Sequence, residues 1–506
     1  MTDSWTSGDG RSASDTAIRL RGEIFQQFAL AAAALLLFAF LTWPTIDFDE
    51  GYFFQSGVLA TITGRPGFPW TNAYYGAPHL YVPLNSLDSL LSWPLAYLPQ
   101  NCWLLAGRLV SALAVCAGVL VLRRRQPKLG LNPGQAGALL FLVTCLPLIL
   151  LARTLRPDGL AFLGTCVGLA LALTPSRVAN FCAGLVVALT ALAHAVHGAL
   201  AGAMVLGMLV FIPALSMREF VNRVLLYCCG AAIPIALFYG MYCAVEKPAA
   251  VWHDINLMLS FTPRYVASLD PAENLAAWTT YIRGQANTWP LLLFAIVALF
   301  VPAGAGSPKH AILFLKAAII AVLVFWIFFY PKKAYTIAVP LLPAAYFVGV
   351  AARPERWPRP LCWALIVCLV ANAALVGRYH WRLLHKPTGM EELAPVAREL
   401  ERQGVLRAHA AVMGKLWLLF ALPRDVTLWD VTAFPVILGK ASGLAPGIDQ
   451  AIRLSDAVIL EWQDGHWADD TQAEIAAHLV HAGWRQVPVA TSRYFQPAEL
   501  KLFLPR

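Results

Sequence analysis

Charged residues are scarce in this chain of 506 residues. Lysine, arginine, aspartate and glutamate together make up 13% of it, whereas 58% of the residues are hydrophobic. The mean hydropathy is +0.61, and these values lie far outside the range of soluble globular proteins. The scarcity of charge therefore predicts a polytopic α-helical membrane protein.

Several signatures of soluble enzymes and disulfide-rich domains are missing. The segment from about residue 387 onward has no glycine-rich phosphate loop, paired-cysteine motif or serine-centred nucleophile motif, and the chain shows no internal repeat. Nine of the ten cysteines lie in or at the edge of apolar runs, and none follows Cys368. They are interpreted as packing residues, which excludes a disulfide framework or a cysteine metal site.

Long apolar runs dominate what is present. Crossing a bilayer takes about 20 helical residues, and eleven runs are candidates: 26–45, 103–122, 134–152, 159–173, 178–194, 199–215, 222–243, 290–304, 311–330, 335–351 and 361–377. The polar residues 1–25 are predicted to be a disordered cytoplasmic tail. Residues 26–386 are expected to form the transmembrane domain, with outer loops 46–102 and 244–289.

The positions of the basic residues predict the orientation. With a cytoplasmic N-terminus, the inner turns carry Arg19, Arg21, Arg123, Arg124, Arg125, Lys128, Arg177, Arg218, Arg223, Lys309, Arg353, Arg356 and Arg359. This pattern follows the positive-inside rule. It explains the net charge of +9 without nucleic acid as a partner, and it predicts an integral protein of the cytoplasmic (inner) membrane.

An acidic stretch follows the first apolar run. Asp47, Asp49 and Glu50 precede Tyr52, Phe53 and Phe54 in TIDFDEGYFFQSG. Carboxylates crowded beside aromatic rings suit proton abstraction or cation binding. The alternative is an ordinary acidic turn at the membrane surface.

Charges near the ends of later runs are further candidates. Arg108 either snorkels to the interface or binds an anion. The segment RTLRPDGL places Arg153, Arg156 and Asp158 at the outer face, where Asp158 is also well placed to cap the next helix.

Two histidines and several outer cations complete the candidate residues. His194 and His197 lie at helical spacing and suit a cation, although no third ligand is adjacent. The long outer segment contributes Arg264, and IFFYPKKAY places Lys332 and Lys333 on the outer side, where an anionic headgroup or phosphate would explain them.

The composition changes near residue 387. MEELAPVARELERQG and TQAEIAAHLVHAGW have helical patterns, whereas SDAVILEWQ and RQVPVA resemble strands. Alternating helices and strands predict that residues 387–506 form an extracytoplasmic α/β domain.

From about residue 25 to 350 the sequence resembles membrane glycosyltransferases of the GT-C fold, in the superfamily of protein O-mannosyltransferases and lipid A aminoarabinose transferases. The similar segments are FDEGYFF, GRPGFPW, YGAPHLYVPLNSLDSLL, LAGRLVSAL, RTLRPDGL and KKAYTIAVPLLPA. The resemblance implies transfer of a sugar from a polyprenyl-phosphate donor to a glycan, lipid or protein acceptor on the outer side of the membrane. It also implies that Asp49-Glu50 is the catalytic signature.

Specific roles follow from that resemblance and from the chemistry of the residues. Asp49 is the expected base, with Glu50 and Asp158 orienting the acceptor or sharing a divalent cation, the candidate cofactor. The candidate ligands of such a cation are Asp49, Glu50, His194 and His197. The expected phosphate ligands are Arg153, Arg156, Lys332, Lys333, Arg108, Arg264 and His79, which stands near the position where the family often has lysine.

Other classes of protein remain as alternatives. A lipid-linked-sugar transporter or flippase typically has intramembrane charges and repeats, whereas here the polar groups cluster at one face. A polymer ligase using diphosphate-linked glycans and a noncatalytic scaffold are the further alternatives.

Overall fold

The computed structural model describes most of the chain. The described residues are 27–41 without 29 and 36, 48–63, 69–70, 79–80, 86–124, 133–174, 176–211, 216–245, 247–249, 251–252, 288–304, 309–329, 334–351, 357–385, 389–407, 409–431, 446–463, 466–467, 470–489 and 498–505. Statements about absent partners below refer to these residues.

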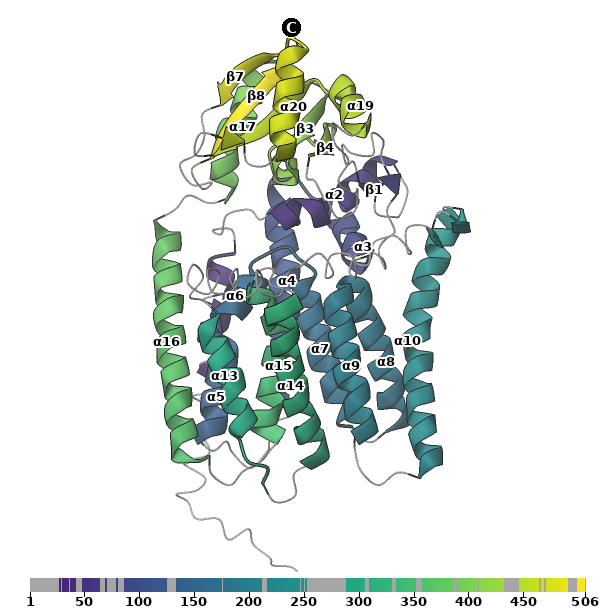
Figure 1. Ribbon diagram of the computed structural model, residues 1–506, viewed down its shortest axis with the longest axis vertical. Coiled ribbons are helices and arrows are strands. Elements are labelled where there is room, and N and C mark those ends of the chain that lie inside the picture. The colour runs from purple at the N-terminus through teal and green to yellow at the C-terminus, as the bar shows by residue number, and fades with distance from the viewer. Residues whose placement is uncertain are drawn as a thin grey trace, which may run out of the picture.

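Apolar helices form one end of the molecule (Figure 1). Among the described residues, five helices are long and apolar enough to cross a membrane: Gln100–Arg124, Gly134–Ala152, Met217–Ala244, Lys309–Trp326 and Arg359–Leu384. Six described helices are shorter: Leu30–Ala39, Asp158–Ala172, Arg177–Ala193, Ala195–Phe211, Trp289–Phe300 and Ala338–Val350. Each of these helices overlaps one of the predicted runs. The number of membrane crossings stays a prediction.

The helical elements carry the following bounds: α4 Gln100–Arg124, α5 Pro133–Thr144, α6 Leu146–Ala152, α7 Asp158–Ala172, α8 Arg177–Ala193, α9 Ala195–Phe211, α10 Met217–Val245, α13 Trp289–Phe300, α14 Lys309–Phe329, α15 Ala338–Ala351 and α16 Arg359–Leu384. Local sequence explains several starts. Proline occupies the first turn of α6, α13 and α16, where no backbone donor is lost. The Ser176 hydroxyl caps α8 by accepting from the Ala179 amide at 3.0 Å.

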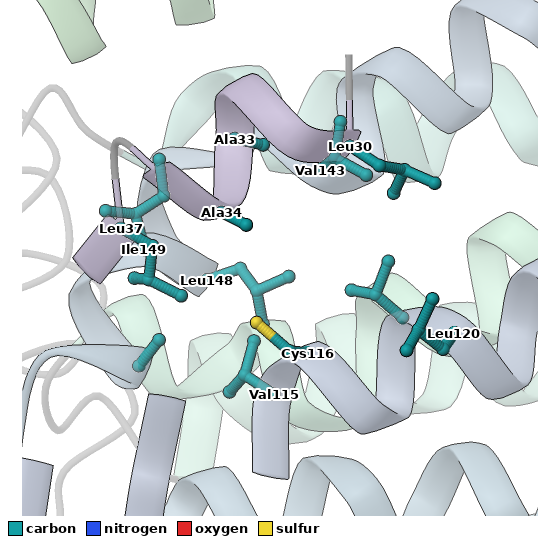
Figure 2. Close-up of a pocket in the computed structure, with 12 residues that line it drawn as sticks. Leu30, Ala33, Ala34, Leu37, Val115, Cys116, Leu120, Val143, Leu148 and Ile149 are labelled. Carbon is teal, nitrogen blue, oxygen red and sulfur yellow. The ribbon is translucent and has the colours of Figure 1, made fainter. Parts of the chain in front are cut away.

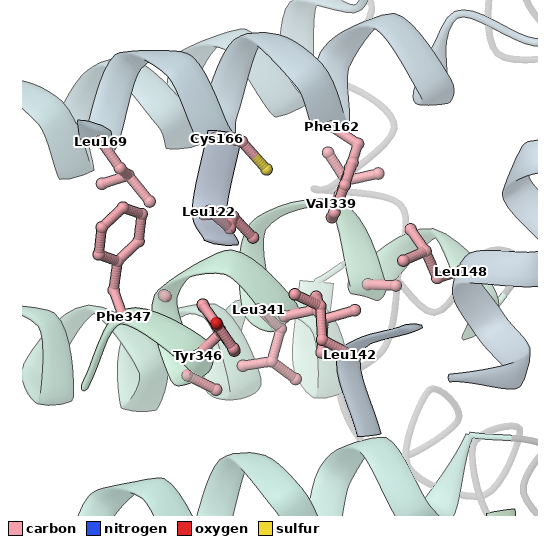
Figure 3. Packing of buried hydrophobic residues seen from close by; sticks show 14 of the residues in the cluster. Leu122, Leu142, Leu148, Phe162, Cys166, Leu169, Val339, Leu341, Tyr346 and Phe347 are labelled. Atoms are coloured by element: carbon pink, nitrogen blue, oxygen red, sulfur yellow. The ribbon is translucent and has the colours of Figure 1, made fainter. Parts of the chain in front are cut away.

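A continuous apolar core joins these helices. Figure 3 shows side chains of α4, α6, α7 and α15 meeting in it, among them Leu122, Leu148, Phe162 and Tyr346. Burial of this kind contributes roughly 25 cal/mol per Å². In a bilayer, where lipid is as apolar as leucine, close packing contributes more than water exclusion.

Residues beyond 388 build a mixed sheet at the other end (Figure 1). The strands are β3 Ala411–Gly414, β4 Thr427–Asp430, β5 Ala457–Gln463, β6 His466–Trp467, β7 Arg485–Val489 and β8 Ala498–Leu504, in the order β4-β3-β5-β8-β7 with β6 beside β5. The β3 strand pairs parallel with β4 and β5, whereas β8 pairs antiparallel with β5 and β7. Helices α17 Gly389–Arg402, α19 Pro446–Leu454 and α20 Asp470–His481 accompany it.

The predicted helices and strands of this segment are confirmed. Both α17 and α20 are followed by glycines with positive φ, Gly404 at 69° and Gly483 at 79°, a conformation that other residues adopt at a cost. The limits 387–506 and the outer location of this part remain predictions.

Short elements lie between the sheet and the apolar helices. The α2 helix spans Phe48–Thr63, and α3 spans Ser86–Leu95, both within the predicted outer loop 46–102. The strands β1 Pro69–Trp70 and β2 His79–Leu80 form an antiparallel pair, in which His79 lies opposite Trp70.

The segment that contains the mixed sheet, from residue 389 onward and called the sheet segment below, packs directly on α2. Phe54 lies 5.2 Å from Trp103 and 5.9 Å from Phe420, measured between ring centroids. Phe420 belongs to the 3-10 helix η3, Leu416–Phe420. These residues share one buried apolar cluster with Val412 and Leu428 of the sheet. The packing fixes α2, which carries the acidic pair, between the two parts of the molecule.

Candidate active site

The Glu50 carboxylate forms a bidentate ion pair with Arg108. Arg108 Nε donates to Oε1 and Nη2 donates to Oε2, both at 2.8 Å, and both side chains are 0% exposed. Arg108 Nη1 also donates to the Leu41 carbonyl at 2.9 Å. Bidentate pairs of this kind are strong and directional. Arg108 therefore points inward and does not snorkel to the interface.

The same carboxylate fixes the turn between α6 and α7. The Leu155 amide donates to Glu50 Oε1 at 2.7 Å. Leu155 belongs to the segment RTLRPDGL, so one carboxylate joins three of the motifs that resemble the glycosyltransferases. The start of α2, which contains Glu50, is thereby joined to the turn at Leu155, the residue before Arg156.

A second buried cluster surrounds Asp158. Its Oδ2 lies 2.9 Å from Arg156 Nε, and its Oδ1 lies 3.0 Å from His197 Nε2 and 3.9 Å from His194 Nε2. A carboxylate only accepts, so His197 Nε2 carries a proton and donates it to Asp158. The His197 ring stacks on Trp326 with centroids 5.6 Å apart. Asp158 begins α7, as predicted, but it is also the partner of both histidines.

His194 lies between α8 and α9, and its side chain is 13% exposed.

These three residues are the described group that could hold a metal ion, because one ligand atom of each lies within 4.8 Å of the others. Glu50 is not in this group, and the predicted ligand set of Asp49, Glu50, His194 and His197 stays a prediction. The third ligand comes from Asp158, which sequence adjacency did not reveal. Arg156 already balances the Asp158 charge, and a guanidinium at 2.9 Å disfavours a cation at the same carboxylate.

Arg153 joins three helices. Its Nη2 lies 2.8 Å from His380 Nε2, and its Nε donates to the Leu37 carbonyl at 3.3 Å. His380 Nδ1 lies 2.7 Å from the Val376 carbonyl and must donate to it, so Nε2 accepts from Arg153. The guanidinium also lies over the rings of Phe40 and Tyr379. Arg153 is 0% exposed.

An apolar pocket of about 150 Å³ lies next to Arg153. Figure 2 shows Leu30 and Leu37 on one side, with Val115 and Cys116 of α4 across the space from them. Ala152, which precedes Arg153, also lines the pocket. Its apolar lining suits a hydrocarbon chain.

Several predicted residues lie outside the described part. Asp47, Arg264, Lys332 and Lys333 are among them. For Asp49 and His79 the structure gives the backbone positions, in α2 and β2 respectively. Their roles stay predictions.

Sequence reasoning missed three neighbours of the site: Tyr379, His380 and Trp326. The first two come from RYHWR at the end of α16, where a histidine among aromatic residues and arginines was an available signal. Trp326 lies in an apolar run and carried no such signal.

The fold and the site together define a polytopic helical protein with an acidic helix held between its apolar bundle and a mixed sheet. No family model matches the sequence, and no curated protein matches it. Solved structures do match. The apo crystal structure of ArnT from Cupriavidus metallidurans has a TM-score of 0.55 and 16% identity, covering 97% of this chain and 98% of that one.

The crystal structure of the same ArnT bound to undecaprenyl phosphate has a TM-score of 0.59 and 14% identity, with the same coverage. A cryo-EM structure of the mycobacterial arabinofuranosyltransferase AftD is also similar, with a TM-score of 0.49 and 13% identity over 95% of this chain and 40% of that one. This chain therefore has the fold of ArnT over nearly its whole length, which confirms the predicted GT-C resemblance at the level of fold.

Proposed function

We propose that this protein transfers a sugar from a polyprenyl-phosphate donor to an acceptor on the outer side of the cytoplasmic membrane. The observation that carries the proposal is the buried Glu50–Arg108 pair with its Leu155 contact. It holds the start of α2 against the turn that carries Arg156 and Asp158. ArnT, which shares the fold, binds undecaprenyl phosphate in its crystal structure.

In the proposed reaction, Asp49 takes the proton from the acceptor nucleophile. The nucleophile bonds to the anomeric carbon while the bond from that carbon to the phosphate oxygen breaks. Polyprenyl phosphate leaves with the electron pair, so displacement in a single step inverts the anomeric centre. Glu50 positions α2, and Asp158 orients the acceptor.

Arg156 is the strongest described candidate for the phosphate. Arg108 and Arg153 are both 0% exposed, whereas Arg156 is 9% exposed and lies between the Leu155 and Asp158 contacts. A preorganised cation stabilises negative charge that develops on the leaving group. Lys332, Lys333, Arg264 and His79 remain proposed contributors, with Arg108 and Arg153 acting from the buried layer.

The apolar pocket supports a lipid carrier. Its wall includes Leu37, whose carbonyl accepts from Arg153. A prenyl chain in this pocket would place its phosphate end near the basic turn. We propose further that transfer needs no divalent cation, because Arg156 already occupies the Asp158 carboxylate. Incubation with EDTA should leave turnover unchanged, and restoration of lost turnover by a divalent metal would contradict this.

The test uses membranes that contain the full chain and radiolabelled polyprenyl-phosphate sugars. Asp49→Asn should reduce transfer by about 10²–10⁴-fold, the usual contribution of a general base. Asp425→Asn, at an exposed position, is the matched control and should transfer normally. Full activity of the Asp49→Asn variant would reject the proposed base.

The same experiment separates the alternatives. A transferase releases polyprenyl phosphate from the donor, whereas a flippase leaves the sugar–phosphate bond intact. Movement of labelled donor across the membrane without release would favour the flippase.

A further inference from the structure

A second cavity, which is polar, lies at the end of the helical bundle opposite the sheet. It has a volume of about 810 Å³ and is lined by residues at the N-terminal ends of α8 and α10. Figure 1 shows α10 descending to this end, far from the sheet. The α8 helix reaches the Asp158 cluster only at its other end, next to His194. The cavity is therefore separate from the candidate active site.

The cavity is positively charged. Arg177, Arg218 and Arg223 line it, and Glu219 is the acidic residue among its lining residues. Arg223 Nη2 donates to Glu219 Oε1 at 3.1 Å, so Arg177 and Arg218 contribute the uncompensated charge. Both are exposed and can turn toward a ligand.

Two helix N-termini converge on the same space. Ser176 caps α8, and the Ser216 hydroxyl accepts from the Glu219 amide at 3.3 Å near the start of α10. Each N-terminus carries partial positive charge. Helices α8 and α10 pack so closely at Gly184 that a Cβ there would collide with the Tyr227 carbonyl. The two positive ends are therefore held together.

A buried amide on the cavity wall is an independent sign of a ligand. Asn180 is 4% exposed and lines the cavity. Within the described part of the chain its side chain makes no hydrogen bond. Its amide borders the polar cavity, where an oxygen-rich ligand would accept a hydrogen bond from it.

The exposed rim of the cavity is apolar. Val221 and Leu225 line it and are 44% and 57% exposed, and nearby Val178 is 71% exposed. They belong to helices of the apolar bundle, where such side chains face lipid. A polar, cationic floor beside an apolar wall matches an amphiphile and does not match a free ion.

We propose that this cavity binds the phosphate headgroup of an anionic phospholipid. Arg177 and Arg218 bind the phosphate oxygens, Asn180 donates from the floor, and the acyl chains lie along Val221 and Leu225. The proposal is independent of sugar transfer.

The test measures lipid binding by the purified full chain in detergent, by native mass spectrometry without sugar donor. Phosphatidylglycerol should bind in preference to phosphatidylcholine. Each arginine removed should weaken binding about fivefold, and the Arg177→Ala/Arg218→Ala variant about 25-fold, from the usual attraction of a basic residue to anionic lipid. The single variant Asn180→Ala, in which Arg177 and Arg218 are unchanged, should also bind phosphatidylglycerol more weakly.

The matched control is Arg359→Ala. Arg359 is also an exposed arginine at the first position of a helix, α16, and does not line the cavity. This variant should bind phosphatidylglycerol normally. Equal binding by the double variant and the wild type would overturn the proposal. Displacement of the lipid by inorganic phosphate at equal concentration would overturn the lipid assignment in favour of a soluble phosphate.

Discussion

The side-chain amide of Gln55 donates a 3.0 Å hydrogen bond to the main-chain carbonyl of Leu428. Gln55 lies in α2, one turn beyond the acidic pair, and Leu428 lies in β4. Gln100 of α4 also donates to the carbonyls of Leu419 and Leu422. The sheet segment is therefore bound to both helices that form the Glu50–Arg108 pair.

Replacing Gln55 should weaken this attachment. Gln55→Leu leaves the Leu428 carbonyl without this donor, which costs about 1–3 kcal/mol. We expect a lower unfolding temperature and slower sugar transfer, because α2 carries Asp49. Gln486→Leu, at an exposed position of β7, should change neither. Unchanged stability of the Gln55 variant would show that the apolar cluster alone holds the sheet.

Removing one partner of the Glu50–Arg108 pair should be costly. Glu50→Gln leaves a buried guanidinium without its counter-charge, and such changes cost about 3–5 kcal/mol. The double variant Glu50→Gln/Arg108→Gln should recover part of the loss, because neither charge is then buried alone. Thermal unfolding of the three proteins checks this. A double variant less stable than the sum of both single changes would contradict it.

Arg156 should affect turnover more than binding if it stabilises the leaving phosphate. We expect Arg156→Gln to lower kcat by about 10²–10³-fold, as for loss of an oxyanion contact. Arg156→Lys should restore part of this, because it keeps the charge. Steady-state kinetics with the lipid-linked donor provide the measurement. A rise in KM with unchanged kcat would assign Arg156 to ground-state binding instead.

The sequence was sufficient for the apolar helices because their signal is local. Each predicted run overlaps a helix, and strands such as β5 were visible in their own residues. The order β4-β3-β5-β8-β7 was not predictable, since it depends on contacts between distant segments. The ion pair of Arg108 was not predictable for the same reason, because its partner Glu50 lies 58 positions away in the sequence.

Candidate residues could be selected by type but not grouped. Asp158 was predicted to cap a helix and to orient the acceptor or share a cation, and His194 and His197 were predicted as a pair with no third ligand adjacent in sequence. Only the packing of α7 against α8 and α9 brings the three together. Arg153 was predicted to bind phosphate, and its contact with His380 depends on α16, which returns to the same end of the bundle after 227 residues.

The bond between Gln55 and Leu428 also has a consequence for biosynthesis. Its partners are separated by 373 positions, and a ribosome adds about 5–20 residues per second, so roughly 20–75 s pass between their synthesis. During that interval the apolar side of α2, including Phe54, lacks the cover that Phe420 and Leu428 provide in the folded protein. A nascent chain stalled before residue 428 would therefore be a natural client for chaperones.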